Sequence, residues 1–358
     1  MSNKQLTHHN HYVPKFYLRR WSSNGNRIWD YRVIVASEHE RHWITTSLKN
    51  AATWDDLYTQ HTDGMDNDAI EDHLCKEYEI PAATILRKLD CEHSLSASEL
   101  TILADFWFIQ HLRTPAYLRK NANEFEGIFE PVAKRTIESV NKQLMGDDRR
   151  VITNRSSLEI AESPFPPQPI EVELDRDPHE VTVRTTVGRN GYLAAVGSLL
   201  NGPVRDYLRN CSWSIIRAPN GSHFYTSDNP AVAFGLRSDG SVTTDGLGLG
   251  QHGVNLVLPL DTDRVLFTQV GSLSLGYPST FTKTQVGYIN EAICKSAFRH
   301  IYSKEKDDSA RRIRPRVVDA NLVNDEKDFR NCWNTDQAAL EREHEQWLIR
   351  NIRRISSL

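Results

Sequence analysis

The hydrophobic and polar positions divide the chain into a β-rich beginning, a helical middle and a second β-rich region. Residues 27–33 alternate as a half-buried strand does. Over residues 66–89, apolar residues recur at intervals of three and four, which predicts an amphipathic helix that Pro81 should kink. Residues 100–112 are apolar nearly all round and follow capping-box spacing at Ser96, so a buried helix is predicted there.

The later elements follow from the same patterns. A third helix is predicted over residues 124–144, and the proline-rich stretch 146–189 reads as a linker and an exposed hairpin. The remaining expected elements are a helix at 191–210 broken at Gly202-Pro203, short strands at 213–216, 223–226, 254–258 and 264–268, and helices at 290–300 and 336–356. Together they predict an α+β fold, with an antiparallel sheet built from the N-terminal and C-terminal halves and a mainly helical middle segment.

This order of elements predicts a single α+β domain over residues 1–303. We expect it to contain the helical segment 66–145, the linker and hairpin 146–189, and a sheet-rich part 190–303. Residues 304–358 then form a C-terminal extension that ends in a helix. The chain has 358 residues, which is long enough for a substantial core.

Charge and cysteine content narrow the function classes. The chain carries 43 Lys and Arg against 47 Asp and Glu, a net charge of −4, so it lacks the global basic field of a general nucleic-acid coat. Five widely spaced cysteines without a CxxC pair argue against a disulfide framework or a thiolate zinc site. With a polar start and no apolar run of roughly 18 residues, we expect a cytoplasmic protein without a membrane segment.

Several polar residues stand where chemistry could occur. On an extended strand, His9 and His11 point to the same face and could share a metal ion; otherwise they belong to a frayed terminus and to packing beneath the aromatic residues. Glu71 and Glu77 lie about 120° apart around a regular helix. Glu77 is expected beside the apolar stripe, with Asp72 and Glu79 facing solvent, and Arg113 is its natural salt-bridge partner.

Polar residues also interrupt the buried helix and one strand end. Gln110 and Arg113 share a face and either satisfy the carboxylates or point into a cleft where the guanidinium could hold a phosphate. Asp228 and Asn229 follow a predicted strand, where a catalytic carboxylate could sit, but Asp-Asn-Pro is also a favourable turn. The glycine-rich and hydrolase motifs of common enzymes are missing, so no nucleotide cofactor is expected.

Two local basic runs leave nucleic acid open as a partner. They cover residues 311–316 (Arg311, Arg312, Arg314 and Arg316) and residues 350–354 (Arg350, Arg353 and Arg354). Such runs can neutralise phosphates, although a solvated face is the commoner explanation.

The chain resembles the HYVP-motif family of bacterial proteins, catalogued as a domain of unknown function (family 4238). The residues that carry the resemblance are His11-Tyr12-Val13-Pro14, Phe16-Tyr17-Leu18, Ile70-Glu71 with Glu77, Gln110 with Arg113-Thr114-Pro115, Phe224 to Pro230 (FYTSDNP), Pro259-Leu260, and Asn290 before His300 to Ser303 (HIYS). The resemblance spans roughly residues 9 to 303, and it implies shared polar positions dispersed over distant segments.

Such dispersal is what a composite polar site would show. Proteins of the family that this chain resembles occur in mobile-element and anti-phage defence settings. The resemblance therefore leads to the hypothesis of a defence effector that acts as a metal-assisted nuclease or phosphodiesterase. In it, Glu71, Glu77 and Asp228, with His9 and His11, hold Mg²⁺, Mn²⁺ or Zn²⁺, His11 acts as base, and Arg113, Gln110 and Asn229 complete the site. The alternative is a non-catalytic binding or sensor module that recognises a phage or host protein or a nucleic acid through its loops and basic tail.

Overall fold

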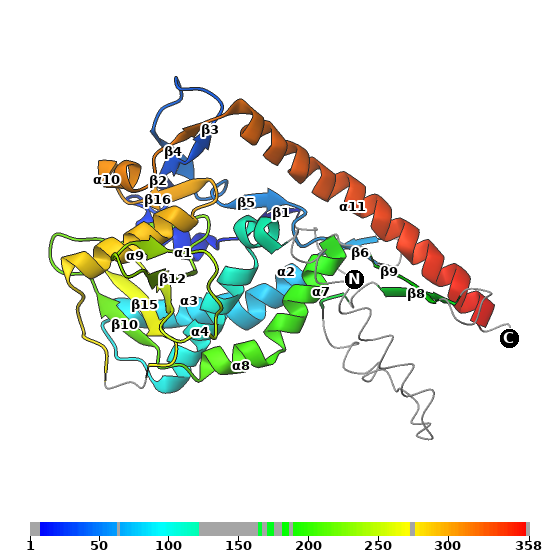
Figure 1. The fold of residues 1–358 in the computed structure, drawn as a ribbon, viewed down its shortest axis with the longest axis horizontal. Coiled ribbons are helices and arrows are strands. Elements are labelled where there is room, and N and C mark those ends of the chain that lie inside the picture. Colours follow the sequence, from blue (N-terminus) through cyan, green and yellow to red (C-terminus); the bar gives the residue numbers. More distant parts are fainter. Residues whose placement is uncertain are drawn as a thin grey trace.

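The computed structural model describes residues 8–62, 65–121, 164–166, 170–174, 181–185, 189–272 and 276–355. Figure 1 shows two antiparallel sheets with helices between and around them. The predicted α+β class is confirmed, because strands from both ends of the chain pair with one another around a helical middle. The predicted helix at 124–144 and most of the predicted linker lie outside the described residues.

The four-stranded sheet joins the two halves of the chain directly. Its order is β11 (Thr226–Ser227), β16 (His300–Ser303), β2 (Arg27–Arg32) and β4 (Trp43–Ser47), and all pairs are antiparallel. Nearby, β1 (His9–His11) pairs with β5 (Thr53–Asp55), β3 (Ile34–Val35) pairs in parallel with β17 (Val317–Val318), and β6 (Gln60–Thr62) pairs with β7 (Met65–Asn67). The N-terminal segment is therefore held by partners from both ends of the chain.

The five-stranded sheet comes from the C-terminal half. Its order is β10 (Ser214–Arg217), β15 (Arg264–Gln269), β14 (Asn255–Pro259), β12 (Val232–Leu236) and β13 (Val242–Thr243). All five residues of β14 are buried, as expected for a central strand covered on both faces. Helix α9 (Lys283–Ser296) packs against β11, β12 and β13, so it covers elements of both sheets. A two-stranded hairpin of β8 (Ile170–Leu174) and β9 (Val181–Thr185) lies in the stretch predicted as an exposed hairpin.

The helical middle is built around one buried helix, α4 (Ala97–Leu112). Ser96 and Glu99 form the predicted capping box at its start, and the helix packs against α3 (Ile80–Asp90), α7 (Arg189–Leu200) and α8 (Pro203–Arg209). The break predicted at Gly202-Pro203 separates α7 from α8. Short α1 (Lys15–Leu18) and the 3₁₀ turn η1 (Arg19–Trp21) complete the main core, which includes Tyr17, Trp21 and Trp107.

The predicted helix over residues 66–89 is interrupted. It consists of α2 (Ala69–Leu74), a π-helical turn η2 (Cys75–Glu79) and α3. Pro81 has no N–H to donate to the carbonyl four residues earlier, so the regular ladder fails at this place. The wider π turn accommodates that loss and changes which side chains face inward.

Three element boundaries differ from the predictions. The strand expected at 223–226 shrinks to β11, because the N–H of Phe224 donates to the Thr262 carbonyl and that of Tyr225 to Asn290 Oδ1. The helix predicted at 290–300 is α9, which begins at Lys283 after a second capping box and ends at Ser296, so that His300 begins strand β16. Helix α11 (Ala320–Ile355) begins well before the predicted residue 336, and Asp319 Oδ1 accepts two N–H groups at its start.

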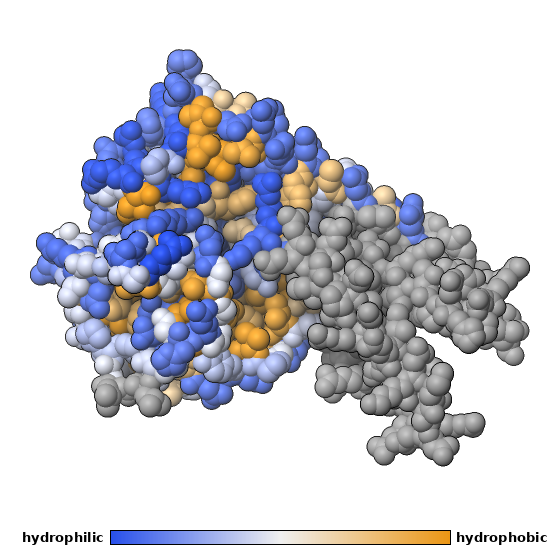
Figure 2. Space-filling model, viewed as in Figure 1, coloured by the Kyte–Doolittle hydropathy of each residue, from blue (hydrophilic) through white to orange (hydrophobic). Residues whose placement is uncertain are grey.

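The predicted C-terminal extension contributes to the main core. Phe329 and Trp333 of α11 pack against Trp54, with ring centroids 5.9 and 6.3 Å away. Between β16 and α11 lie α10 (Asp308–Ile313) and β17, and Figure 2 shows an apolar area over β3 and the start of α11. Val317 and Val318 are more than two-fifths exposed. None of the described helices combines the length and apolarity that a membrane crossing requires.

Candidate functional site

The aromatic N-terminal segment is a buried anchor. Tyr17 donates to the Pro259 carbonyl at 2.6 Å and therefore accepts from the Thr226 hydroxyl at 2.9 Å. Trp21 Nε1 donates to the Phe224 carbonyl at 3.0 Å. These contacts explain why aromatic residues are dense at the start of a predominantly polar chain. These bonds hold the segment against β11 of the four-stranded sheet and β14 of the five-stranded sheet.

His9 and His11 lie on the same side of β1, with ring centroids 5.8 Å apart, as the strand periodicity predicts. Each ring is already bonded to the protein. His9 Nδ1 lies 2.6 Å from Asp55 Oδ1, and His11 Nε2 donates to the Leu48 carbonyl at 3.1 Å. Burial is the main reason that the pKa of His11 falls to about 4. His11 is therefore neutral near pH 7 and holds the strand to the loop before β5.

Arg113 is the centre of a second, fully buried polar group at the end of α4. Its Nη1 donates to Glu79 Oε1 at 2.7 Å, and its Nε and Nη2 each donate to the amide oxygen of Gln110 at 2.7 Å in the orientation that satisfies both residues. Tyr58 donates to the Arg113 carbonyl at 2.9 Å. Arg113 and Gln110 are 1% and 0% exposed. The guanidinium is used inside the protein and does not face an open cleft.

The predicted orientation of the acidic residues on this helix is wrong. Glu79 forms the salt bridge with Arg113, whereas Glu77 is exposed. The π turn is the physical reason, because its extra residue rotates the positions after Cys75 relative to a regular helix. Glu71 lies beside this pair, and its Oε2 is buried without a hydrogen bond to the described residues. Burial raises the pKa of Glu71 to about 7.

Asp228 forms a third group. It is completely buried and accepts the backbone N–H groups of Phe298, Arg299 and His300 at 2.8, 2.7 and 3.0 Å. Burial raises its pKa to about 6 even though these donors favour the carboxylate. Asn229 connects different elements, accepting from the Thr114 hydroxyl at 3.1 Å and donating to the Ser296 carbonyl at 2.9 Å. Asp228 thus holds the turn after α9 against the end of β11.

These polar residues serve three separate networks. In the part of the chain that the structure describes, no three His, Cys, Asp or Glu side chains come together as a metal ion would require. The five residues expected to ligate a metal are dispersed between the β1 strand, the α2 helix with its π turn, and the turn after β11. His9, His11 and Asp228 use their polar atoms in hydrogen bonds within the fold, whereas Glu77 is exposed and Glu71 has one oxygen without a hydrogen bond to the described residues.

A pocket of about 580 Å³ opens beside the second and third networks. Its wall comes from the end of α4 and the residues after it, from β12 with Asn229 before it, from the C-terminus of α9, and from the glycine-rich loop 244–249. The polar residues of the lining that matter here are His111, Lys120, Asn121, Asn229, Asp245 and Lys295. We call this cavity the His111 pocket.

His111 is held rigidly in the wall of this pocket. Its ring stacks on Trp107 one turn earlier, with centroids 5.1 Å apart and planes at 9°, and Tyr117 meets it edge-on at 5.5 Å. Nδ1 lies 3.0 Å from the Ala231 carbonyl, which can only accept, so Nδ1 carries the proton. Burial lowers the pKa of His111 and nearby Lys120 lowers it further. Nε2 therefore presents a lone pair and makes no hydrogen bond to the described residues.

The pocket also has one unpaired cation. Lys120 is exposed and has no ion-pair partner among the residues described, whereas Lys295 is bound to Glu291 at 2.6 Å and to the Val242 carbonyl at 3.0 Å. In the glycine-rich loop, Leu247 and Leu249 pack against the core. A Cβ at Gly246 would meet nothing within 4 Å, and its φ of +70° suits glycine. The loop backbone at this point is accessible.

Sequence reasoning did not select His111 as a site residue. The polar positions late in the apolar helix are visible in the sequence, but only the fold brings His111 next to the glycine-rich loop. The local signal in the sequence is that Gln110, His111 and Arg113 all interrupt the same apolar helix. Gln110 and Arg113 form hydrogen bonds inside the protein, whereas His111 lines the pocket.

The first basic run is mainly structural. Arg316 donates to the carbonyls of Arg32, Glu40 and Arg41 at 2.6 to 3.2 Å, and Arg311 pairs with Asp308. The side chains of the second run, at residues 350–354, lie outside the described residues.

The fold and the pocket define an α+β protein with a pre-formed cavity between its helical middle and its C-terminal sheet. The sequence profile of the family described as "Protein of unknown function (DUF4238)" matches residues 9–307, and the chain belongs to this family. A search of curated proteins finds no match, and neither does a search of solved structures. The match ends before β17 and α11.

Proposed function

We propose that this protein is a binding module whose ligand, a small anion that also carries hydroxyl groups, occupies the His111 pocket. The observation that carries the proposal is the state of His111. Its ring is fixed by Trp107 and by the Ala231 carbonyl, it is neutral, and its Nε2 is free to accept a hydrogen bond. A rigid hydrogen-bond acceptor in the wall of a cavity is a recognition group.

The ligand class follows from the chemistry of the wall. Lys120, which has no ion-pair partner among the residues that the structure describes, can receive an anionic group of the ligand. His111 Nε2 and the Asp245 carboxylate are acceptors, which suit ligand hydroxyl or amide donors rather than a second anionic group. A cavity of about 580 Å³ lies within the range of small-molecule sites, roughly 300–1,000 Å³. A sugar phosphate has this combination of groups.

The other predicted functional residues favour binding over metal-assisted hydrolysis. Asp228 is enclosed by three N–H donors, Arg113 by Glu79 and Gln110, and His11 by a backbone carbonyl. A hydrolase needs such groups directed at a substrate. The hypothesis of a metal-assisted nuclease competes with our proposal and makes a different prediction, which is metal-dependent cleavage of RNA or DNA.

Isothermal titration with ribose 5-phosphate, AMP and inorganic phosphate tests the proposal. We expect ribose 5-phosphate to bind in the micromolar to millimolar range. Lys120→Ala should weaken binding about fivefold or more, and His111→Gln should weaken it similarly while leaving inorganic phosphate binding less affected. Lys49→Ala is the control, because Lys49 is exposed and does not line the pocket.

Two outcomes would contradict the proposal. One is the absence of binding by all three probes at millimolar concentration, or binding that Lys120→Ala and His111→Gln leave unchanged. The other is metal-dependent cleavage of RNA or DNA by the wild-type protein that is lost in a folded His11→Ala variant. The second result would support the metal-assisted nuclease.

A further inference from the structure

A second cavity, of about 670 Å³, lies on another part of the protein, between α1 with η1, α3, and the turn before β15. The residues that line it and enter the argument are Phe16, Arg19, Ile80, Leu86, Arg87 and Asp263, together with the four charged residues of its floor. We call it the α3 groove. It shares no lining residue with the His111 pocket.

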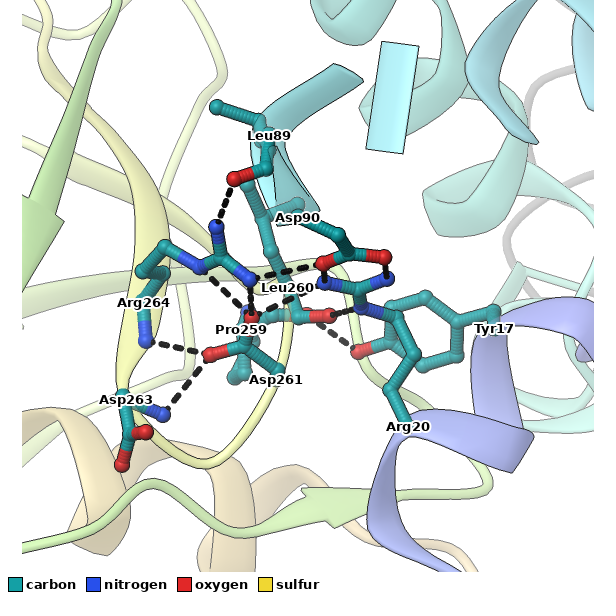
Figure 3. A network of polar contacts seen from close by, with 9 residues as sticks. All are labelled: Tyr17, Arg20, Leu89, Asp90, Pro259, Leu260, Asp261, Asp263 and Arg264. Atoms are coloured by element: carbon teal, nitrogen blue, oxygen red, sulfur yellow. Dashed lines mark hydrogen bonds and ion pairs between the residues drawn. The ribbon is translucent and has the colours of Figure 1, made fainter. Parts of the chain in front are cut away.

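The floor of the groove is a rigid network of two arginines and two aspartates, shown in Figure 3. Arg20 binds both oxygens of Asp90, at 2.6 and 2.9 Å, and also reaches Asp261 at 3.0 Å. Arg264 binds the same two carboxylates, at 2.9 and 2.6 Å. The guanidinium groups also donate to the Leu260 and Leu89 carbonyls at 2.6 Å each.

This floor is electrically neutral as a unit, since each guanidinium is matched by a carboxylate. It also joins the N-terminal segment, α3 and the β14–β15 turn, which lie far apart in sequence. A bidentate, cross-linked network of this kind fixes the shape of the groove before any partner arrives.

The rim of the groove carries unpaired positive charge. Arg19 and Arg87 are exposed, and neither forms an ion pair with the residues described. Arg87 makes one hydrogen bond, to the Thr84 hydroxyl at 3.2 Å. Asp263 is the remaining acidic residue in the lining. With a neutral floor, the rim has one positive charge in excess, and both free guanidinium groups can receive carboxylates.

Apolar side chains lie beside these arginines. Ile80 is 55% exposed, the largest value among the exposed large hydrophobic residues, and Phe16 and Leu86 line the same groove. Beside a formed cavity, the exposed Ile80 side chain can contact an apolar group of a partner.

The groove is elongated. Ile80, Ala83, Arg87 and Asp90 all line it and are spaced three, seven and ten residues from the first, so they follow one face of α3. At 1.5 Å per residue this face is about 15 Å long. An extended peptide rises about 3.3 Å per residue, so four or five residues match it.

We propose that the α3 groove binds a short extended segment of a partner protein, with acidic residues at Arg19 and Arg87 and an apolar residue between Phe16 and Ile80. The positive rim, the apolar wall and the length of the face together select this ligand. A compact anion would use the arginines and leave Ile80 exposed.

Fluorescence anisotropy of the full-length protein with two labelled hexapeptide pools tests this. In one pool, Asp or Glu flank a central Leu or Phe; in the other, Lys or Arg take the acidic positions. We expect the acidic pool to bind, the basic pool to fail, and added salt to weaken binding. Binding of both pools alike, or of neither, would refute the proposal.

Substitutions test whether the acidic peptides bind in the α3 groove. Arg19→Glu/Arg87→Glu should weaken the acidic pool about tenfold or more, and Ile80→Ser several-fold. The matched control Arg41→Glu/Arg312→Glu makes the same charge change at exposed residues outside the groove and should leave binding unchanged. Equal losses in both double variants would mean that only net charge matters, and the proposal would fail.

The same variants distinguish peptide binding in the α3 groove from anion binding in the His111 pocket. The Arg19→Glu/Arg87→Glu protein should still bind ribose 5-phosphate, since no residue of the His111 pocket changes. Competition of AMP or inorganic phosphate with the peptides would identify the groove as a site for compact anions and overturn the peptide assignment.

Discussion

Replacing Glu71 by Gln should stabilise the protein at high pH and leave it nearly unchanged at low pH. Glu71 has one carboxylate oxygen buried without a hydrogen bond to the described residues, beside the Arg113–Glu79 ion pair. Its pKa is raised to about 7 from an ordinary value of 4.5, and burial is the largest cause. Gln resembles the protonated side chain in size and hydrogen bonding, so it removes the charge with little other change.

The magnitude follows from proton linkage. Because the folded state holds the proton more tightly than the unfolded state, stability falls as pH rises from about 4.5 to about 7 and is then constant. Each unit of pKa shift corresponds to 1.36 kcal/mol, and the side chain keeps some solvent contact. We therefore expect the charged form to cost about 2 to 3 kcal/mol of unfolding free energy above pH 7.

Urea unfolding of both proteins between pH 4.5 and 8 measures this directly. The free energy of Glu71→Gln minus that of the wild type should be close to zero at pH 4.5 and rise to about 2 to 3 kcal/mol at pH 8. Other titrating groups are common to both proteins and cancel in the difference. A difference that does not change with pH would refute the description of Glu71 as a buried carboxylate with a raised pKa.

Four further substitutions test the packing and hydrogen bonding. Asp228→Asn should lower the unfolding free energy by about 2 to 4 kcal/mol at pH 7, because the amide cannot accept all three N–H groups. A loss below about 1 kcal/mol in urea unfolding would contradict this reason. Ser96→Ala should cost about 1 kcal/mol by removing the α4 cap, seen as a lower melting temperature, and an unchanged midpoint would argue against the cap. Gly197→Ala should destabilise the protein by about 1 to 3 kcal/mol, because the new Cβ would lie 2.6 Å from Phe165 Cβ. The control Gly287→Ala on α9 meets nothing within 4 Å and should stabilise the protein by about 0.5 to 1 kcal/mol. Equal effects of the two substitutions in calorimetry would refute the close approach at Gly197.

Periodicity and caps were sufficient for most of the described fold. The capping box at Ser96, the break before Pro203 and the alternating strand at 27–33 each depend on neighbouring residues, so the sequence alone indicates them. An antiparallel sheet shared by the two halves of the chain was predicted, but its strand β16 was not, since residues up to His300 were expected to be helical. The pairing of β2 with β16 depends on contacts between segments some 270 residues apart, which no local pattern indicates.

The arrangement of the candidate functional residues could be predicted less well from the sequence. A regular helix places Glu77 inward and Glu79 outward, and the π turn before Pro81 reverses that order. Asp228 looks the same in sequence whether it faces a substrate or three backbone N–H groups; only the fold, which brings residues 298–300 to it, decides. His111 needs Ala231 and the glycine-rich loop to become a fixed acceptor in a pocket, and no local pattern links these segments.

Calorimetric titration of the wild-type and His111→Gln proteins with ribose 5-phosphate tests most directly whether the His111 pocket binds a small hydroxylated anion. We expect saturable binding to the wild type, weakened about fivefold or more in the variant, while both proteins unfold at similar temperatures. Equal affinity of the two folded proteins, or no heat of binding to the wild type at millimolar ligand, would contradict it.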